Sequence, residues 1–282
     1  MSRYTTLISA ADLKVHADQP AWRILDCRFN LMQPAQGRRD YDAGHIPGSQ
    51  YADLDRDLAS VVTPHSGRHP LPDPAVFEAT LHQWGISNDS QVVAVDDGSG
   101  ALAARLWWLM RWLGHDAVAV LDGGLAAWQA AGGTLVRTPS SWPAGRFHGL
   151  QRPNQVVSTA EIARRLDSRQ PLQLVDARDP DRFAGKVEPI DTVAGHIPGA
   201  LNFPFAKNIA GDGRWRPPAD LRQDWLELLG GEPDDDWAVM CGSGVTACHL
   251  ALSAAYAGLG EPRLYAGSWS EWIRDPARPV DP

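Results

Sequence analysis

The chain repeats itself, and this duplication constrains the fold more than any other feature of the sequence. Four short segments of the first half recur in the same order in the second half, offset by 150, 151, 144 and 144 residues. The pairs are Asp26-Cys27-Arg28 with Asp176-Ala177-Arg178, Gly44–Ser49 with Gly195–Ala200, Asp97–Gly100 with Cys241–Gly244, and Gly123 and Trp128 with Gly267 and Trp272. A conserved order with changing offsets indicates a tandem duplication with different loop lengths, so each half should fold as one copy of the same unit.

Each copy alternates short apolar runs with segments of helical spacing. The runs predict strands at 23–27, 91–96 and 118–121, then at 172–176, 238–241 and 263–265. The helical segments lie at 74–84, 101–113 and 125–131, then at 159–168, 219–229 and 245–259. Such alternation predicts an α/β fold in which each copy has a mainly parallel sheet flanked by helices. The segment 137–155 is rich in Pro, Ser and Arg, so we expect it to link an N-terminal domain at 1–136 to a C-terminal domain at 156–282.

Composition excludes several classes of protein. Hydrophobic residues make up 44% and charged residues 21% of 282 residues, which is typical of a globular chain with room for two cores. The net charge of −8, with no run of Lys or Arg, disfavours nucleic acid and acidic membrane surfaces as partners, although local arginines can still bind small anions. The chain has three cysteines and no apolar run of signal-peptide or membrane length, which favours the reducing cytoplasm. No cysteines or histidines have the spacing of a zinc site, and we expect neither a metal nor a cofactor.

Cys241 is the strongest candidate for chemistry. It ends an apolar run and begins the glycine-containing turn 242–245, directly before a helix start. The N–H groups of such a turn and the positive end of a helix dipole both stabilise negative charge, so the thiol is placed to become a nucleophilic thiolate. The alternative is a buried cysteine that packs as a small hydrophobic residue. The first copy has Asp97 at the matching position, and a carboxylate cannot accept and pass on a sulfur atom. We therefore expect chemistry in the C-terminal half and a supporting role for the N-terminal half.

Other chemistries fit this loop less well. A cysteine phosphatase needs an arginine six residues after the cysteine, where this chain has Ala247. The pattern Gly242-x-Gly244-x-x-Ala247 matches a loose dinucleotide fingerprint, but it comes late in its domain and no acidic residue ends the next strand. No Gly-Lys-Ser/Thr follows, which excludes a phosphate-binding P-loop. A noncatalytic binding module would be expected if Cys241 were absent, as its counterpart is from the first copy.

Several motifs together resemble the tandem-domain rhodanese family of sulfurtransferases over essentially the whole chain. These are GHIPG at 44–48 and 195–199, GSWSEW at 267–272, and CGSGVTA at 241–247. The last is similar to the mercaptopyruvate branch, whereas the thiosulfate branch typically has basic residues there, as in CRKGVT. The resemblance implies two rhodanese-like domains, of which only the second is catalytic.

The resemblance also implies a reaction. Cys241 would take sulfur from a small anionic donor, 3-mercaptopyruvate or alternatively thiosulfate, and become a persulfide. The backbone of Gly242, Gly244, Val245 and Thr246 would hold the donor and the persulfide. A thiol, cyanide or a thioredoxin-like protein would then accept the sulfur, which predicts ping-pong kinetics. A noncatalytic sulfur carrier or binding module is the alternative from another class.

The same resemblance implies roles for residues outside the cysteine loop. Ser243 would work with His69 and Asp55 in proton transfer, and Arg182 would bind the donor. The alternatives are a surface-loop histidine, a solvated aspartate and a surface ion pair. Mercaptopyruvate enzymes usually have a second arginine after a Glu-Pro pair, but here Ile190 follows that pair. Donor preference is therefore open, unless another basic group such as Lys186 compensates.

Other polar and thiol residues are expected to be structural. His45 and His196, within the GHIPG motifs, should hydrogen-bond to backbone in a turn. Arg178 should pair with Asp176 or a neighbouring carboxylate. Cys27 and Cys248 should be packed, although an oxidative pairing of Cys248 with Cys241 is left open.

Overall fold

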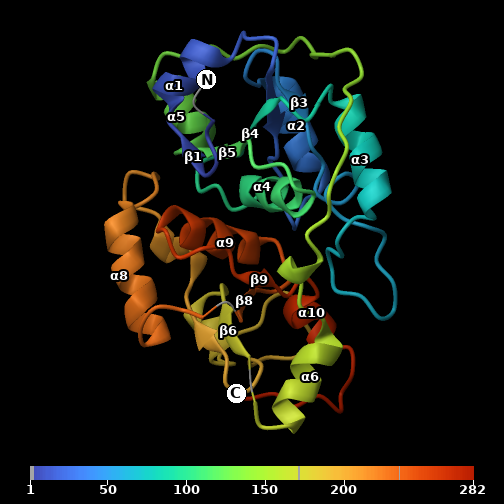
Figure 1. Ribbon diagram of the computed structural model, residues 1–282, viewed down its shortest axis with the longest axis vertical. Helices are drawn as coiled ribbons and strands as arrows, with labels where there is room; N and C mark the ends of the chain where they lie inside the picture. The colour runs from blue at the N-terminus through green and yellow to red at the C-terminus, as the bar shows by residue number, and fades with distance from the viewer. Residues whose placement is uncertain (1–2, 171, 235) are drawn as a thin grey trace. The chain divides into compact units, whose positions relative to one another are not determined.

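A computed structural model describes residues 3–170, 172–234 and 236–282 and divides into two units (Figure 1). Unit 1 comprises Met1–Ser60, Pro72–Arg152 and Ala210–Trp215, and unit 2 comprises Val61–Leu71, Pro153–Ile209 and Arg216–Pro282. Each unit contains one copy of the sequence repeat. The segment Val61–Leu71 comes from the first half of the sequence but belongs to unit 2, and this placement matters for the site. The domain bounds 1–136 and 156–282 and the linker 137–155 remain predictions.

Unit 1 contains a five-stranded sheet in the order β1-β5-β4-β2-β3, and every neighbouring pair is parallel. Helices α1 and α5 pack on one face of this sheet, and α4 packs on the strands β4 and β5 from the other face (Figure 1). Its elements are β1 (Leu7–Ile8), α1 (Ala10–His16), β2 (Trp22–Asp26), α2 (Ala35–Ala43), β3 (Gln50–Tyr51), α3 (Pro74–Gln83), β4 (Gln91–Val95), α4 (Ala103–Trp112), β5 (Val118–Leu121) and α5 (Gly124–Ala130).

Unit 2 contains a four-stranded parallel sheet in the order β7-β6-β8-β9, which reproduces the order β3-β2-β4-β5 of unit 1. The predicted α/β class, with two parallel sheets flanked by helices, is therefore confirmed. The elements of unit 2 are η1 (Pro153–Gln155), α6 (Thr159–Asp167), β6 (Gln173–Asp176), α7 (Pro180–Phe183), β7 (Leu201–Asn202), η2 (Phe205–Asn208), α8 (Pro218–Leu229), β8 (Trp237–Met240), α9 (Thr246–Tyr256), β9 (Arg263–Leu264) and α10 (Ser268–Trp272).

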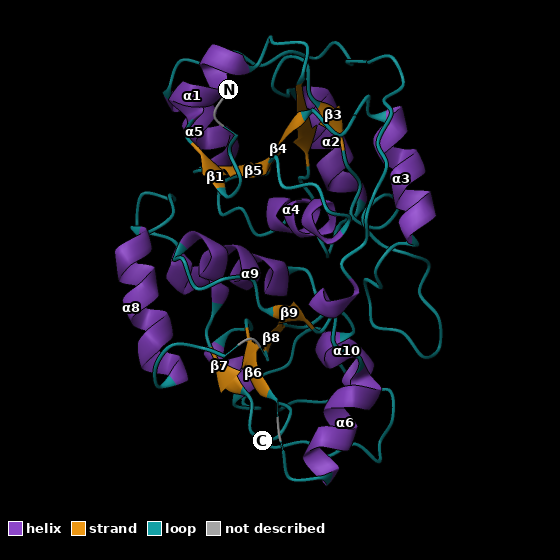
Figure 2. Ribbon diagram, in the orientation of Figure 1, coloured by secondary structure: helices purple, strands orange, loops and turns teal. Residues whose placement is uncertain are grey.

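Alternate side chains of β8 point to opposite faces of the sheet of unit 2 and pack against different helices. Ala238 and Met240 pack with Trp269 and Trp272 of α10 and with residues of α6. Trp237 points to the other face, where its ring meets that of Trp225 of α8 edge-on at 5.3 Å. Helices thus cover both faces of the sheet (Figure 2), and β8 is buried along its whole length. A strand buried on both faces delivers the residue after it, Cys241, to a fixed position at its carboxyl end.

The repeated strand ends form matching buried ion pairs. Arg28 contacts Asp26 at 2.7 Å in unit 1, and Arg178 contacts Asp176 at 2.7 Å in unit 2. The same two guanidinium groups each donate at 2.8 Å to a carbonyl of the GHIPG motif, that of Gly44 or of Gly195. The predicted pairing of Arg178 is confirmed, and the pair fixes the turn that follows it.

The histidines of the two GHIPG motifs are also structural, as predicted. His45 bonds to the carbonyl of Tyr41 at 2.8 Å through Nδ1 and stacks on that ring at 3.9 Å. His196 makes the same contacts with Phe183, at 2.9 Å and 3.9 Å. Repetition of one arrangement in both units, including the unit without the cysteine, indicates support of a turn rather than catalysis.

Some elements lie outside the sequence prediction. The two-residue edge strands β1, β3 and β7 carry no measurable alternation, so apolar pattern does not predict them. The helices α1, α2 and α7 also lie outside the prediction. Among the described residues, no helix is both long enough and apolar enough to cross a membrane.

An ion cluster on unit 2 gives a pH-dependent contribution to stability. Glu161 accepts from Arg263 at 2.7 and 2.8 Å and from Arg165 at 3.1 Å. Hydrogen bonds from Arg263, aided by Arg165, hold the pKa of Glu161 below its ordinary value of 4.5. Because the folded pKa is lowered, the contribution is present above the unfolded pKa and is lost as the pH falls through the folded value.

We therefore expect Glu161→Gln to lower the free energy of unfolding by about 1 kcal/mol at neutral pH, allowing for solvent screening. The difference between wild type and variant should shrink as the pH falls below 4.5. Urea unfolding across a pH series measures this, with the exposed Glu227→Gln on α8 as control. A constant difference at all pH values would contradict the assignment.

Candidate active site

The loop after β8 directs two backbone N–H groups at the sulfur of Cys241. The N–H groups of Ser243 and Gly244 lie 3.4 and 3.1 Å from Sγ. Gly244 has φ +79°, and a side-chain carbon there would come within 2.4 Å of the carbonyl oxygen of Ala266, so only glycine fits. Helix α9 begins at Thr246 with Val245 at its N-cap and no side-chain cap. The loop is shaped to stabilise negative charge on sulfur.

Helix α10 satisfies the other polar groups of this loop. Ser268 Oγ accepts from the N–H of Cys241 at 3.1 Å. The N–H groups of Trp269 and Ser270 donate to the carbonyls of Cys241 and Gly242 at 3.0 and 2.9 Å. The GSWSEW motif therefore has a physical role: it fixes the loop through hydrogen bonds to the backbone of Cys241 and Gly242, while the N–H groups of Ser243 and Gly244 are directed at Sγ.

The matching loop of unit 1 is filled by a carboxylate from the chain itself. Asp96 stands at the position equivalent to Met240, directly before the loop, and it is 3% exposed. Its side chain accepts from the N–H groups of Gly98 and Gly100, each at 3.0 Å, and from those of Leu102 and Ala103 at 3.0 and 3.2 Å. The sequence comparison singled out Asp97, but Asp96 explains why this loop cannot hold an anionic sulfur. The acidic residue immediately before the loop was the feature of the sequence that could have indicated this.

The segment Val61–Leu71 brings His69 to the catalytic loop. The backbone N–H of Gly67 donates to Glu271 Oε2 at 3.1 Å, and that of Arg68 donates to Ser270 Oγ at 3.0 Å. His69 Nδ1 then lies 2.8 Å from Ser243 Oγ, and both side chains are buried. The predicted surface-loop alternative for His69 does not fit this burial, and the pair can share a proton next to the cysteine.

Asp55, the third member of the predicted relay, belongs to unit 1. It lies in the loop after β3, where its N–H donates to Asp53 Oδ1 at 2.9 Å. Asp55 is exposed, and partial desolvation, reinforced by the charge of Asp53, raises its pKa. Its cooperation with His69 and Ser243 remains a prediction.

Arg182 lies in α7 and is held by two buried carboxylates. Its Nη2 contacts Glu188 Oε1 at 2.7 Å and Asp191 Oδ2 at 3.2 Å. Both carboxylates are 4% exposed, and the arginine side chain is 15% exposed. Burial alone would raise the pKa of Glu188, but hydrogen bonds from Arg182 and from the backbone of Asp191 and Ile190 outweigh it and lower that pKa. Arg182 is thus a fixed cation rather than a mobile surface side chain.

A second guanidinium lies at the loop, and it belongs to a residue that sequence reasoning missed. A side-chain carbon built on Gly242 would lie 3.3 Å from Arg68 Nη2 and 3.7 Å from Arg182 Nη2. Lys186, which the sequence left open as a compensating basic group, pairs with Asp181 at 3.1 Å, and both of these side chains are more than half exposed. The position of Arg68 directly before His69 was the feature of the sequence that could have placed it at the site.

The other two cysteines are packed, as predicted. Cys248 is fully buried in α9, and its thiol donates to the carbonyl of Gly244 at 3.2 Å. Cys27 is 1% exposed, and burial, with the neighbouring Asp26, raises the pKa of its thiol well above the usual range. Cys241 itself is 2% exposed, and none of these three cysteines forms a disulfide.

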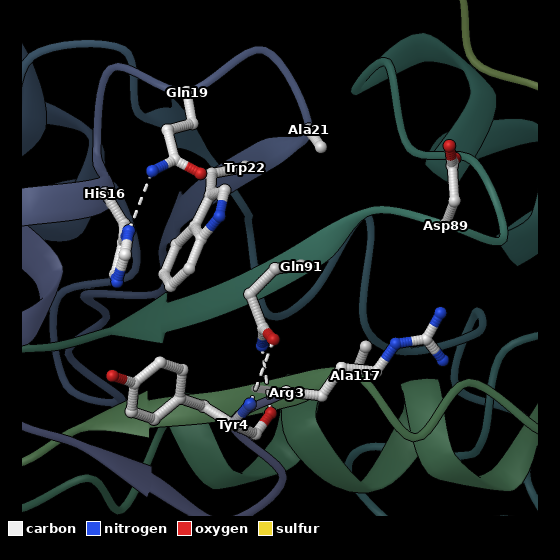
Figure 3. Close-up of a pocket in the computed structure, with 9 residues that line it drawn as sticks. All are labelled: Arg3, Tyr4, His16, Gln19, Ala21, Trp22, Asp89, Gln91 and Ala117. Carbon is white, nitrogen blue, oxygen red and sulfur yellow. Dashed lines mark hydrogen bonds between the residues drawn. The ribbon is translucent and has the colours of Figure 1, made fainter. Parts of the chain in front are cut away.

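A separate hollow of about 620 Å³ lies in unit 1 (Figure 3). His16 stacks on Trp22 at 4.7 Å and contacts the amide of Gln19 at 2.8 Å. The amide of Gln91 bonds to both the N–H and the carbonyl of Tyr4. This hollow borders the beginnings of β2 and β4, whereas parallel sheets place ligands at the carboxyl ends of their strands. We therefore assign the chemistry to the Cys241 loop.

Comparison with known proteins agrees with this geometry. The rhodanese-like domain family model matches residues 9–131 and 158–275. A Pseudomonas aeruginosa protein described as "Probable 3-mercaptopyruvate sulfurtransferase" is 51% identical over 277 residues and 97% of each chain. The thiosulfate sulfurtransferase of Rattus norvegicus is 33% identical over 260 residues, covering 90% of this chain and 86% of that protein. The solved structure of the 3-mercaptopyruvate sulfurtransferase from Leishmania major has a TM-score of 0.84 and 32% identity, covering 95% of this chain and 74% of that one.

The chain therefore belongs to the rhodanese-like family and carries two such domains. The resemblance inferred from the paired GHIPG motifs and the cysteine loop is confirmed. The sulfurtransferase names of these relatives agree with the predicted enzyme class. The roles of individual site residues remain proposals, which the geometry above supports.

Proposed function

We propose that this protein transfers sulfur from 3-mercaptopyruvate to an acceptor through a persulfide on Cys241. One observation carries the proposal: two N–H groups are directed at the Cys241 sulfur, beside a buried Ser243–His69 pair at 2.8 Å. The first arrangement stabilises an anionic sulfur, and the second can deliver a proton to a departing group. Both are needed when the bond that breaks joins sulfur to carbon.

The first half-reaction exchanges one bond for another. The Cys241 thiolate attacks the donor sulfur, and a sulfur–sulfur bond forms as the carbon–sulfur bond breaks. The bonding pair leaves with carbon as the enolate of pyruvate. The Ser243–His69 pair passes the proton of the donor's S–H group to that carbon, and the persulfide is left as an anion. Two guanidinium groups at Gly242, those of Arg68 and Arg182, offer positive charge to an anionic donor.

The second half-reaction regenerates the thiolate. A thiol, cyanide or a thioredoxin-like protein attacks the outer sulfur of the persulfide, and Cys241 leaves as the thiolate that the loop N–H groups stabilise. Because a thiolate must be kept reduced between turnovers, the cytoplasm is the proposed compartment.

Thiosulfate is the second candidate donor, and a specific observation supports it. Ile190 stands where the mercaptopyruvate branch usually has an arginine, and a relative at 33% identity is a thiosulfate sulfurtransferase. With this donor the sulfur–sulfur bond breaks and its electron pair leaves with sulfite, which needs no proton on carbon.

Steady-state kinetics with the two donors side by side test the proposal. We expect a higher kcat/KM for 3-mercaptopyruvate, with pyruvate released in proportion to the sulfur transferred. Parallel double-reciprocal lines for donor and acceptor would support the two half-reactions. A higher kcat/KM for thiosulfate would reverse the order of the donors, and no transfer from either would refute the function.

Replacing Arg182 by alanine should raise the KM for the better donor about tenfold or more, because a fixed cation at the loop is lost. The substitution leaves Glu188 with Arg178, 3.5 Å away, as its remaining cationic partner. Circular dichroism and thermal unfolding should therefore accompany the kinetics. Lys186→Met, which removes an exposed positive charge of the same unit, is the control. A KM unchanged from wild type would contradict donor binding by Arg182.

A further inference from the structure

Two guanidinium groups from distant parts of the sequence lie on the same side of the catalytic loop. Arg68 comes from the segment Val61–Leu71 and Arg182 from α7, yet both come within 4 Å of a side-chain carbon built on Gly242. Gly242 directly follows Cys241 in the sequence, so both guanidinium groups lie at the loop that carries the cysteine.

A single buried carboxylate holds the two guanidinium groups together. Asp191 Oδ1 lies 2.7 Å from Arg68 Nη1, and its Oδ2 lies 3.2 Å from Arg182 Nη2. The aspartate side chain is 4% exposed, whereas the Arg68 side chain is 25% exposed. Asp191 thus fixes the spacing of the two cations, and Arg182 has Glu188, at 2.7 Å, as a second carboxylate partner.

The backbone of Arg68 is also tied to the loop. Its N–H donates to Ser270 Oγ at 3.0 Å, while the N–H of Ser270 donates to the carbonyl of Gly242 at 2.9 Å. The Nε of Arg68 is buried and has no hydrogen-bond partner among the described residues. A rigidly held guanidinium with an N–H group that makes no hydrogen bond to the described residues is suited to bind an anion.

Position 190 borders a hollow that Arg68 also lines. Arg68, Ile190 and Asp191 all line one hollow of about 400 Å³ on unit 2. An arginine at position 190, where the resemblance to the mercaptopyruvate branch implies one, would therefore border the same hollow as Arg68 from a different backbone position.

We propose that Arg68 is a donor-binding residue that, together with Arg182, grips the carboxylate of a 2-oxo acid donor and replaces the arginine missing at position 190. Asp191 is the positioning residue of the pair. This inference rests on the function proposed above. It makes the segment Val61–Leu71 the source of two parts of the site, because the guanidinium of Arg68 and the imidazole of His69 arrive on neighbouring residues.

The test is steady-state kinetics with 3-mercaptopyruvate on wild type, Arg68→Met, Arg68→Lys and the double variant Arg68→Met/Ile190→Arg. Arg68→Met should raise KM about 10- to 100-fold with a much smaller change in kcat. Arg68→Lys, which keeps the charge but loses the planar fork, should fall between the two. The double variant should regain at least part of the affinity, and Lys186→Met should behave as wild type.

A merely structural role gives a different pattern. If Arg68 only supports His69, Arg68→Met would lower kcat with KM unchanged, and Ile190→Arg would restore nothing; that result would overturn the inference. Thermal unfolding of each variant identifies loss of fold. If Arg68→Met is unfolded, the KM of Arg68→Lys decides between donor binding and a structural role. Failure of the proposed function is distinguishable, because wild type would then form no persulfide on Cys241 with either donor, whatever stands at position 68.

Discussion

Cys241→Ser should abolish sulfur transfer from both donors, by about 1,000-fold or more, and leave the fold intact. Serine keeps the size of the side chain and its place at the end of β8. A hydroxyl is a poor nucleophile towards sulfur, and no persulfide can form on oxygen. The N–H groups of Ser243 and Gly244, which lie 3.4 and 3.1 Å from Sγ, would then face an oxygen that does no chemistry.

Turnover of both donors and thermal unfolding of the variant measure this. Cys248→Ser is the matched control, because it changes a second buried thiol in the same unit that the mechanism does not use. We expect it to retain most of the activity. Substantial turnover by Cys241→Ser would show that another group carries the sulfur.

Ser243→Ala should lower kcat with 3-mercaptopyruvate about 100-fold and affect transfer from thiosulfate far less. The difference follows from the two leaving groups. The enolate of pyruvate is a strong base that needs a proton as it departs, whereas sulfite is a stable anion. Ser243 Oγ lies 2.8 Å from His69 Nδ1, so removal of the hydroxyl breaks this hydrogen bond between the loop serine and the imidazole.

The pair can be tested as a unit. His69→Gln should reproduce the donor-selective loss, and the double variant Ser243→Ala/His69→Gln should lose little more than either single variant. Losses that multiply in the double variant, or a fall of equal size with thiosulfate, would mean that the two residues do not form one proton-transfer path for the enolate.

The sequence predicts most of the fold because the information is local and duplicated. The central strands β2 and β4 are short apolar runs, and they recur in the same order as β6 and β8. The pairing of Arg178 with Asp176 is predictable for the same reason, since the two residues are neighbours in the chain and the pattern recurs in unit 1.

The parts of the site that sequence reasoning missed depend on contacts between distant residues. Nothing local shows that Val61–Leu71 belongs to unit 2, because its anchors Ser270 and Glu271 lie some 200 residues away. The proposed role of Arg68 depends on that anchoring. The sequence alone also does not show that Lys186 pairs with Asp181. Asp96 was missed because its carboxylate folds back onto the loop that follows it.

Mass spectrometry of the intact protein and its peptides after exposure to donor tests the central claim most directly. Incubation with 3-mercaptopyruvate or thiosulfate, without acceptor, should add about 32 Da, one sulfur atom, to the peptide that contains Cys241. The peptides of Cys27 and Cys248 should be unchanged, and a thiol acceptor should remove the added mass. No such gain on Cys241, or a gain on another residue while turnover proceeds, would contradict the account.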